Sequence, residues 1–235
     1  MSKKIAILQS NYIPWKGYFD LINMVDEFVI YDDVQYTRRD WRNRNLIKTP
    51  QGLLWLTIPV EVKGKYYQTI KDTVISEKKW PKKHWTAISI NYLKSKYYRE
   101  YKEFFEKLYL DCNEKYLSEI NYKFIKAINK LLGIKTNISR SSDYSLTNGK
   151  TERLVDICIQ SKATEYISGP AAKDYIDEKL FLENGINLTW MDYSNYPIYN
   201  QLYPPFEHGV SIVDLIFNEG INAHRFMKSF NRVTK

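Results

Sequence analysis

The 235-residue sequence contains few of the residues from which cross-linked or metal-held folds are built. Its two cysteines, Cys112 and Cys158, lie far apart and form no CxxC pair, which excludes a disulfide framework and a zinc knuckle. We expect both to be ordinary packing thiols. Only three histidines are present, with no HExxH motif and no clustered Cys/His pairs, so no metal site is predicted. The sequence also lacks a Gly-x-Ser-x-Gly motif, which argues against a nucleophilic triad.

Long apolar runs are also absent. No stretch approaches the roughly 20 consecutive apolar residues that a membrane-spanning helix needs, so no membrane span is expected. The first residues lead directly into an apolar strand pattern, without the apolar core and cleavage site of a secretory signal. The sequence therefore predicts a cytoplasmic protein. Its length predicts one large domain, or one domain with a helical insertion. With the strand and helix patterns described below, we expect a single α/β domain over residues 1–235 with a mainly helical insertion at about 80–133.

The net charge of +8 is concentrated in one part of the chain. Between Lys63 and Lys102 there are 11 basic and three acidic residues, whereas Asp143–Asp192 has five basic and nine acidic residues. Solvated lysines on helix faces would account for the basic segment. The next interpretation is a surface that attracts an anionic small molecule such as a nucleotide-sugar. Nucleic acid is not expected as a partner.

Strand and helix patterns alternate at both ends of the chain. Lys4–Gln9 has the pattern of a buried strand, the apolar residues of Gly17–Val25 recur at helical intervals, and Glu27–Tyr31 has a second strand pattern. Strand, helix and strand at this spacing predict a βαβ unit with parallel strands and a right-handed crossover. We therefore predict an α/β fold with a Rossmann-like, mostly parallel sheet and an inserted helical subdomain.

The remaining elements are predicted from the same periodicities. A strand over Trp55–Val62 would lie at an edge or beside a bulge because it contains Pro59. The helical region from about Pro81 should be interrupted near residues 94–98 and 116–117, with Gly133 as its C-cap. The other predicted segments are an extended stretch at Tyr67–Ile75, strands at Ile134–Ser139, Thr164–Ile167 and Asn187–Met191, and helices at Thr151–Ser161, from Gly169, at Ser211–Asn218 and at Ala223–Phe230.

The loop after the first strand is the first candidate for ligand binding. In an open parallel sheet, ligands lie beyond the carboxyl ends of the strands, and a helix that begins there offers free N–H groups to an anion. A glycine in this loop would let a ligand approach the backbone closely. A packed aromatic loop explains the same residues equally well. The candidates are Gln9, Tyr12, Trp15, Gly17 and Tyr18.

Acidic and then basic residues follow the second strand. One of Asp32 and Asp33 would reach the same rim and suit a cation or a sugar hydroxyl, although a turn cap is the alternative. Four arginines then fall within seven positions of a chain that otherwise favours lysine. Because a guanidinium can hold phosphate through two hydrogen bonds, we expect Arg42 or Arg44 to contact an anionic ligand. Further candidates in this segment are Gln35, Trp41 and Asn43.

His84 is the leading candidate for a general base. It lies at the first turn of a predicted helix, next to lysines such as Lys83, and nearby cations would lower its pKa and favour the neutral form. A structural histidine is the alternative interpretation, and His208 and His224 rank lower. Near the other end of the chain, a strand leads into a predicted helix through a Ser-Gly-Pro sequence, which would make a second anion cradle or an ordinary capped helix. The candidates there are Ser168, Gly169 and Lys173.

Taken together, these segments resemble the WbqC-like protein family. The resemblance implies a role in bacterial polysaccharide or O-antigen biosynthesis, in making or decorating a nucleotide-linked sugar, and it does not fix a reaction. The motifs that carry it span nearly the whole chain in order and are Gln9-x-x-Tyr12-x-Pro14-Trp15-x-Gly17-Tyr18-Phe19, Tyr31-Asp32-Asp33-Val34-Gln35-Tyr36, Asp40-Trp41-x-Asn43-Arg44-Asn45, Trp80-x-Lys82-Lys83-His84, Tyr166-x-Ser168-Gly169-Pro170 and Ser211-Ile212-Val213-Asp214-Leu215.

The leading hypothesis is a transferase that places an acyl or aminoacyl group on the amine of a nucleotide-linked amino sugar. The diphosphate would lie against Arg42 or Arg44 and the helix start at Gly17, and His84 would remove a proton from the amine. A phosphate-bearing acyl donor such as coenzyme A would explain the lysine-rich helices, but no sequence feature demands it, and the sequence leaves the cofactors unknown. The hypothesis requires residues 17, 44 and 84 to converge on one electropositive hollow.

Two other classes of function fit the same sequence. One is nucleotidylyl transfer or ATP-dependent ligation, with Asp32 or Asp33 holding Mg²⁺. By spacing, Trp15-Lys16-Gly17-Tyr18 is similar to the His-x-Gly-His element of nucleotidylyltransferases, but the two histidines that stabilise the transferred phosphoryl group are absent. The other is a non-catalytic nucleotide-sugar-binding partner of a glycosyltransferase. The sequence names neither the sugar nor the donor, and it leaves the oligomeric state open.

Overall fold

The computed structural model describes residues 2–231, and its centre is a five-stranded parallel sheet. The strands are β1 (Lys4–Leu8), β2 (Glu27–Ile30), β5 (Asn137–Arg140), β6 (Glu165–Ser168) and β7 (Asn187–Trp190). They lie in the order β5-β2-β1-β6-β7, so the chain winds outward in one direction, returns to the centre and winds out the other way. This is the strand order of a Rossmann-like fold. The predicted fold class is confirmed.

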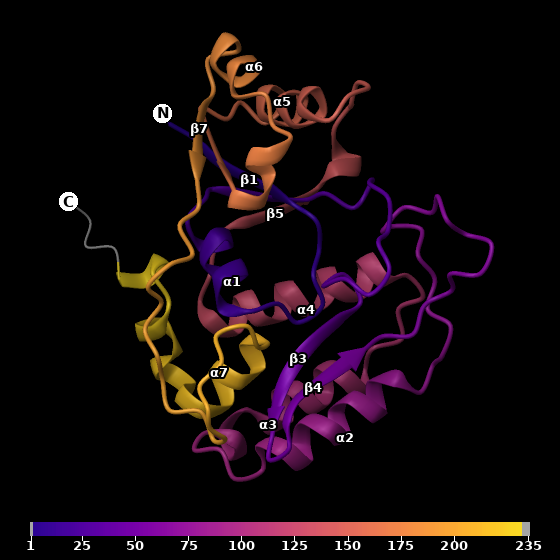
Figure 1. Cartoon of the computed structure of the whole chain (residues 1–235), viewed down its shortest axis with the longest axis vertical. Coiled ribbons are helices and arrows are strands. Elements are labelled where there is room, and N and C mark those ends of the chain that lie inside the picture. The colour runs from indigo at the N-terminus through magenta and orange to yellow at the C-terminus, as the bar shows by residue number, and fades with distance from the viewer. Residues whose placement is uncertain (1, 232–235) are drawn as a thin grey trace.

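Helices cover both faces of the sheet (Figure 1). On one face lie α5 (Thr151–Gln160) and α6 (Glu178–Glu183), and on the other lie α1 (Lys16–Asn23) and α4 (Leu117–Leu132). Successive side chains of a strand point to opposite faces. In β1, accordingly, Ile5 and Ile7 join the core under α5 and α6, whereas Ala6 joins the core that contains α1 and α4.

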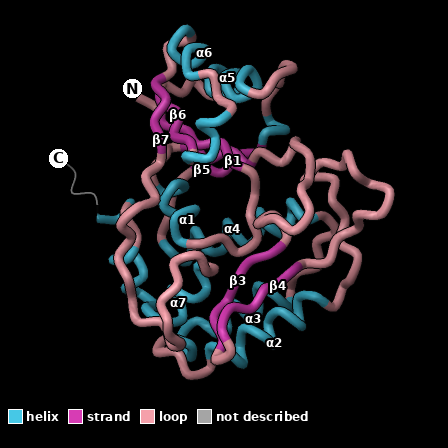
Figure 2. Tube along the Cα trace, viewed as in Figure 1, coloured by secondary structure: helices cyan, strands magenta, loops and turns pink. Residues whose placement is uncertain are grey.

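The long connection between β2 and β5 forms a hairpin and three helices. The hairpin consists of β3 (Arg44–Thr49) and β4 (Gly52–Thr57), and the helices are α2 (Trp80–Tyr92), α3 (Tyr98–Leu110) and α4. The interruptions predicted in the helical region are confirmed, and Gly133 caps α4 with a φ of 72°. In Figure 2 the hairpin and α2 lie beyond α1 and α4, on the side away from the parallel sheet. Their buried side chains belong to the same core as those of α1 and α4.

Two predictions in this connection were wrong. The strand expected at Trp55–Val62 ends at Thr57, and the stretch Tyr67–Ile75 contributes only isolated bridges. Strand β3 was not predicted, because Asn45 and Lys48 interrupt its apolar pattern. Both residues are nevertheless buried, since their side chains donate hydrogen bonds to backbone carbonyls of other loops.

The carboxyl-terminal part is mostly short helices and loops. Ser211 caps α7 (Ile212–Glu219), and its Oγ accepts a hydrogen bond from the Val213 amide. The helix expected from Gly169 is a 3₁₀ helix, Pro170–Asp174, and the one expected at Ala223–Phe230 is divided into two. The 3₁₀ helices not yet given are Ser141–Asp143, Gly220–Phe226 and Ser229–Asn231. Within residues 2–231, no helix combines the length and apolar character needed to cross a bilayer.

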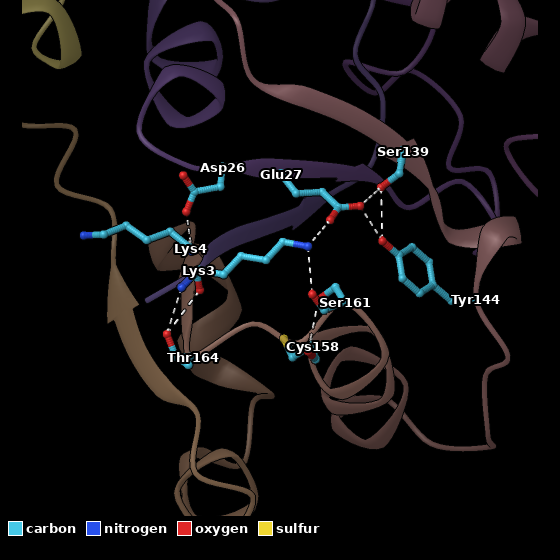
Figure 3. A network of polar contacts seen from close by, with 9 residues as sticks. All are labelled: Lys3, Lys4, Asp26, Glu27, Ser139, Tyr144, Cys158, Ser161 and Thr164. Atoms are coloured by element: carbon cyan, nitrogen blue, oxygen red, sulfur yellow. Dashed lines mark hydrogen bonds and ion pairs between the residues drawn. The ribbon is translucent and has the colours of Figure 1, made fainter. Parts of the chain in front are cut away.

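A network of ion pairs and hydrogen bonds connects the strands near the amino-terminal ends of β1 and β2 (Figure 3). The Lys3 Nζ lies 2.7 Å from the Glu27 Oε2 and donates to the Ser161 carbonyl at the end of α5. Ser139 and Tyr144 donate hydrogen bonds to the Glu27 carboxylate. Burial raises the pKa of Glu27, but these donors outweigh it and hold the pKa below its usual value. The network therefore fixes the edge opposite the one at which ligands are expected.

Candidate functional site

A cavity of about 510 Å³ opens at the carboxyl edge of the sheet, and we call it the switch-point cavity. Gln9 follows β1, Tyr31 follows β2, and Ser168 and Gly169 lie at the end of β6. The strand order reverses between β1 and β6, and in open α/β sheets ligands bind at such a point. Four predicted site residues line this cavity, namely Gln9, Arg42, Ser168 and Gly169.

The switch-point cavity carries positive charge. Arg42, Lys150 and Arg153 line it, and no carboxylate is found among its described lining residues. Within the described chain, Lys150 and Arg153 have no ion-pair partner within 4.0 Å, whereas Arg42 lies 3.6 Å from the Asp40 Oδ2. The Arg153 guanidinium is 5.3 Å from the centre of the Tyr31 ring. Two cations free of ion pairs and an arginine at one rim are suited to an anionic ligand.

A second cavity, of about 670 Å³, is lined by aromatic rings and amides, and we call it the aromatic cavity. Trp15 and Trp41, both predicted site residues, line it together with Tyr193 and Tyr196. The Trp15 ring centre is 5.2 Å from that of Tyr193 and 5.5 Å from that of Tyr196. No aspartate, glutamate, lysine or arginine is among the described residues of its wall. The cavity thus suits an uncharged group with flat faces.

Two loops connect the two cavities. Asn11 lines the aromatic cavity, Arg42 lines the switch-point cavity, and the Arg42 Nη1 donates a hydrogen bond to the Asn11 Oδ1. The Tyr12 amide donates to the Trp41 carbonyl at 3.0 Å. The Asn45 Nδ2 donates to the carbonyls of Tyr12 and Ile13, each at 3.0 Å. The loop after β1 and the loop before β3 therefore form a wall shared by both cavities.

The shared wall contains a strained residue. Ile13 has a φ of 36°, in the left-handed region that β-branched side chains rarely adopt. It also precedes Pro14, and a residue before proline is normally extended. The two hydrogen bonds from Asn45 hold this conformation. Strain of this kind persists where surrounding contacts over-determine the backbone, and it concentrates at binding sites.

Gly17 positions a residue of the aromatic cavity. A Cβ atom at position 17 would lie 2.3 Å from the Cζ2 of Trp15, so the glycine makes room for the indole ring. We expected a ligand to use this space, but the Trp15 side chain fills it. The neighbouring Lys16 is buried, and its Nζ donates to the Pro197 carbonyl at 2.8 Å. Burial lowers the pKa of Lys16 to about 8.

Of the three histidines, His208 lies in the wall of the aromatic cavity, as described for residues 2–231. Its exposed imidazole lies on the wall of the aromatic cavity, with its ring centre 4.6 Å from that of Phe206. Partial burial and the Lys16 ammonium lower the pKa of His208, and the Glu207 carboxylate partly opposes them. His208 is therefore neutral near pH 7 and can accept a proton.

His84 lies in the aromatic core. Its Nδ1 is 2.8 Å from the Tyr12 hydroxyl and its Nε2 is 3.2 Å from the Thr57 carbonyl, so both ring nitrogens have protein partners. Burial lowers the pKa of His84 to about 4. The Tyr12 hydroxyl also contacts the Tyr109 hydroxyl at 2.7 Å. Neither His84 nor Tyr12 lines the switch-point cavity or the aromatic cavity.

Asp32 and Asp33 are engaged by other parts of the protein. The buried Asp32 carboxylate accepts hydrogen bonds from the Ser10 amide at 2.8 Å, from the Ser10 hydroxyl at 2.7 Å and from Ser118 at the start of α4. Asp33 is ion-paired with Lys71 and accepts from a serine hydroxyl. Burial raises the pKa of Asp32, whereas the lysine and serine contacts outweigh burial and lower that of Asp33. Among the described residues, no cluster of three metal-ligating side chains occurs.

The remaining predicted residues are spread over the fold. Residues 17, 44 and 84 do not meet in either cavity. The Arg44 guanidinium lies 4.0 Å from the centre of the Trp55 ring. The Tyr18 hydroxyl donates to the Gln9 carbonyl. The other contacts are Gln35 to the Tyr66 carbonyl, Asn43 to the Ile58 carbonyl, Lys83 to Glu77, and Lys173 over the Trp190 ring.

Several residues of the two cavities had no distinctive sequence signal. Lys150 and Arg153 come from the part of the chain whose net charge is negative. Tyr193, Tyr196 and His208 lie in a segment without regular structure. For Lys150 and Arg153 the signal is the strand order, because it places β6, and the start of the helix before it, beside the loop after β1. The strand order gives no such signal for Tyr193, Tyr196 and His208.

Comparison with known proteins agrees with the motifs. The model of the WbqC-like protein family matches residues 9–226. The chain belongs to this family. A curated relative, the uncharacterized protein Rv1507c of Mycobacterium tuberculosis (strain ATCC 25618 / H37Rv), is 51% identical over 226 residues, which cover 96% of this chain and 98% of the relative. No solved structure matches the chain.

Proposed function

We propose that this WbqC-like protein is a transferase of surface-polysaccharide biosynthesis that places an acyl or aminoacyl group on the amine of a nucleotide-linked amino sugar. The observation that carries the proposal is the switch-point cavity, where Arg42, Lys150 and Arg153 line the position at which Rossmann-like folds bind nucleotides. The resemblance discussed above, which implies polysaccharide biosynthesis, supports a sugar as the group attached to the nucleotide.

The cavity offers a partner to each part of such a ligand. The cationic side chains would hold the diphosphate through charge-assisted hydrogen bonds. The rings of Tyr31 and Tyr175 line the same cavity and would contact the base or the ribose. Arg42 lies at the wall shared with the aromatic cavity, so a diphosphate bound there would place its sugar close to that wall.

Equilibrium binding tests the nucleotide site. We expect the protein to bind at least one member of a panel of UDP- and dTDP-linked amino sugars, with an affinity that falls as salt is added. Replacing Arg153 with methionine should weaken binding by about 10- to 100-fold, because a hydrogen bond to a charged group contributes roughly 1.5–3 kcal/mol. Arg99→Met is the matched control, since Arg99 is exposed on α3 and lies outside both cavities.

Titration calorimetry gives the decisive comparison. If no nucleotide-linked sugar of the panel binds, or if Arg153→Met and Arg99→Met bind equally well, the assignment of the switch-point cavity is wrong. A uniform loss of binding in both variants would point to general surface charge, and it would also contradict the proposal.

Mass spectrometry of the ligand tests the reaction. Incubation of the bound amino sugar with acyl and aminoacyl thioesters should increase its mass by that of the acyl group less one hydrogen. Binding without any mass change across the donor panel would favour the non-catalytic alternative. Pyrophosphate release from ATP would instead favour the ligase or nucleotidylyltransferase alternative.

A further inference from the structure

We propose that the aromatic cavity holds the amino-sugar ring and that His208 accepts the proton that the sugar amine loses on acylation. The inference rests on the function proposed above and adds the place of the reacting group and the catalytic base. A lining residue of each cavity meets the other in the Asn11–Arg42 hydrogen bond, so a ligand bound against Arg42 in the switch-point cavity lies close to the wall of the aromatic cavity.

The chemistry of the aromatic cavity fits a sugar ring. Its indole and phenol rings can cover the C–H face of a pyranose, and amide groups can both donate to and accept from hydroxyls. The Asn45 amide is already used, because its Nδ2 and Oδ1 both bond to the backbone. Asn11 accepts from Arg42 through its Oδ1, which leaves its Nδ2 for a ligand. Asn195 also lines the cavity.

His208 is the side chain of this wall that can exchange a proton near neutral pH. Burial raises the pKa of Tyr193 to about 12 and that of Tyr196 further, so both phenols stay protonated. The groups that act on the His208 imidazole are the Lys16 ammonium from α1 and the adjacent Glu207 carboxylate. Lys16 is a positioning residue in this scheme, because it keeps the imidazole neutral without contacting the substrate.

The proton balance of the step is simple. The free amine of the sugar attacks the carbonyl carbon of an acyl thioester, and a C–N bond forms while the C–S bond breaks. The amine proton passes to the His208 imidazole, and the thiolate leaves. The imidazolium then gives the proton to the thiolate. The products are an amide and a thiol, and no oxidant or reductant is needed.

Kinetics with the substrate found by mass spectrometry tests the role of His208. We expect His208→Gln to lower kcat by roughly 10²- to 10⁴-fold with little change in KM, because general-base catalysis contributes a factor of this size. The matched control is His224→Gln, which replaces an exposed histidine outside both cavities. Lys16→Met should move the acid limb of the kcat profile to higher pH. A His208→Gln variant with unchanged kcat would overturn the inference.

NMR of the imidazole protons tests the site without any reaction. The chain has three histidines, and the two variants assign the signals of His208 and His224. We expect a saturable shift of the His208 signal with glucosamine or with an amino sugar from the panel, and no such shift with UDP alone. Absence of that shift with all of these sugars would overturn the inference. A shift without any acyl transfer would refute the proposed reaction but retain the sugar site.

Discussion

Replacing Gly17 with alanine should destabilise the protein by pushing Trp15 out of its place. The added Cβ would lie 2.3, 2.6 and 2.7 Å from three atoms of the Trp15 indole, whereas ordinary contacts are 3.4–4 Å. The indole has to move by roughly 1 Å, and it packs against Tyr193 and Tyr196. Overpacking of this kind costs about 1–3 kcal/mol. Alanine recovers at most about 1 kcal/mol through its higher helix propensity. The net loss is therefore about 0–3 kcal/mol.

Gly169→Ala is the matched control for this substitution. Gly169 has an ordinary φ of −70°, and a Cβ atom there would meet no heavy atom within 4 Å. Alanine at this position should raise stability by about 0.4–1 kcal/mol, because it restricts the unfolded chain. Thermal unfolding of the two variants should separate them, since 1 kcal/mol shifts the Tm of a chain of this size by about 2–4 °C.

A double-mutant cycle isolates the contact with the indole. In a Trp15→Ala background the steric conflict is gone, so Gly17→Ala should become neutral or stabilising through helix propensity alone. The change in sign is the diagnostic result. If Gly17→Ala is as stable as Gly169→Ala in the original background, or if Trp15→Ala leaves its effect unchanged, the argument about Gly17 is wrong.

Three further predictions concern stability. Between pH 6.5 and 4 the unfolded chain protonates His84 while the folded protein does not, so the free energy of unfolding should fall by about 3 kcal/mol over this range as the pH drops. The free energy of unfolding of His84→Gln, measured in urea, should lack this pH dependence. The same pH dependence in the variant and in the original protein would contradict the prediction. Glu27, whose pKa is lowered, stabilises the fold above its unfolded pKa and loses this effect as the pH falls through its folded pKa. Glu27→Gln should therefore cost about 1–2 kcal/mol at pH 7 and nothing measurable in acid. Ser211→Ala should cost about 1 kcal/mol through loss of the α7 cap, and Ser211→Gly, which is tolerated at an N-cap and adds no volume to this buried site, should cost less in the same assay.

The parallel sheet could be predicted because its strands carry strong local signals. β1 and β2 are short apolar runs on either side of the amphipathic helix α1, and a strand–helix–strand pattern by itself predicts that the two strands pair in parallel. β3 could not be predicted in this way. Its buried residues include the polar Asn45 and Lys48 as well as Ile47, so the strand has no apolar alternation to detect. The burial of Asn45 and Lys48 is explained by the hydrogen bonds that they make to distant loops.

The residues of the candidate site that the sequence predicted are those that follow β1 or end β6. They could be predicted because the carboxyl ends of parallel strands lie at the same edge of a sheet, where ligands bind. Gln9, Ser168 and Gly169 line the switch-point cavity for this reason. His84 illustrates why other positions could not be placed. Its lysine-rich neighbourhood suggests a surface, but α2 buries one face, which turns His84 toward Tyr12 while Lys83 stays exposed. Adjacent residues of a helix point in different directions, so His84 can be buried while Lys83 is exposed. The residue types alone do not show which of the two is buried.

Arg42 and Arg44 show the same limit within one segment, and they also connect the fold to the proposed chemistry. The two side chains are two residues apart, yet Arg42 lines the switch-point cavity and Arg44 stacks on Trp55 of the hairpin. Arg44 begins β3, so its direction is set by the strand, whereas Arg42 lies in the turn that bonds to the loop after β1. The turn therefore places Arg42 in the wall of the switch-point cavity and in contact with Asn11, which lines the aromatic cavity. On the function proposed above, a phosphate bound by the Arg42 guanidinium would compete with the Asn11 Oδ1 for its N–H groups.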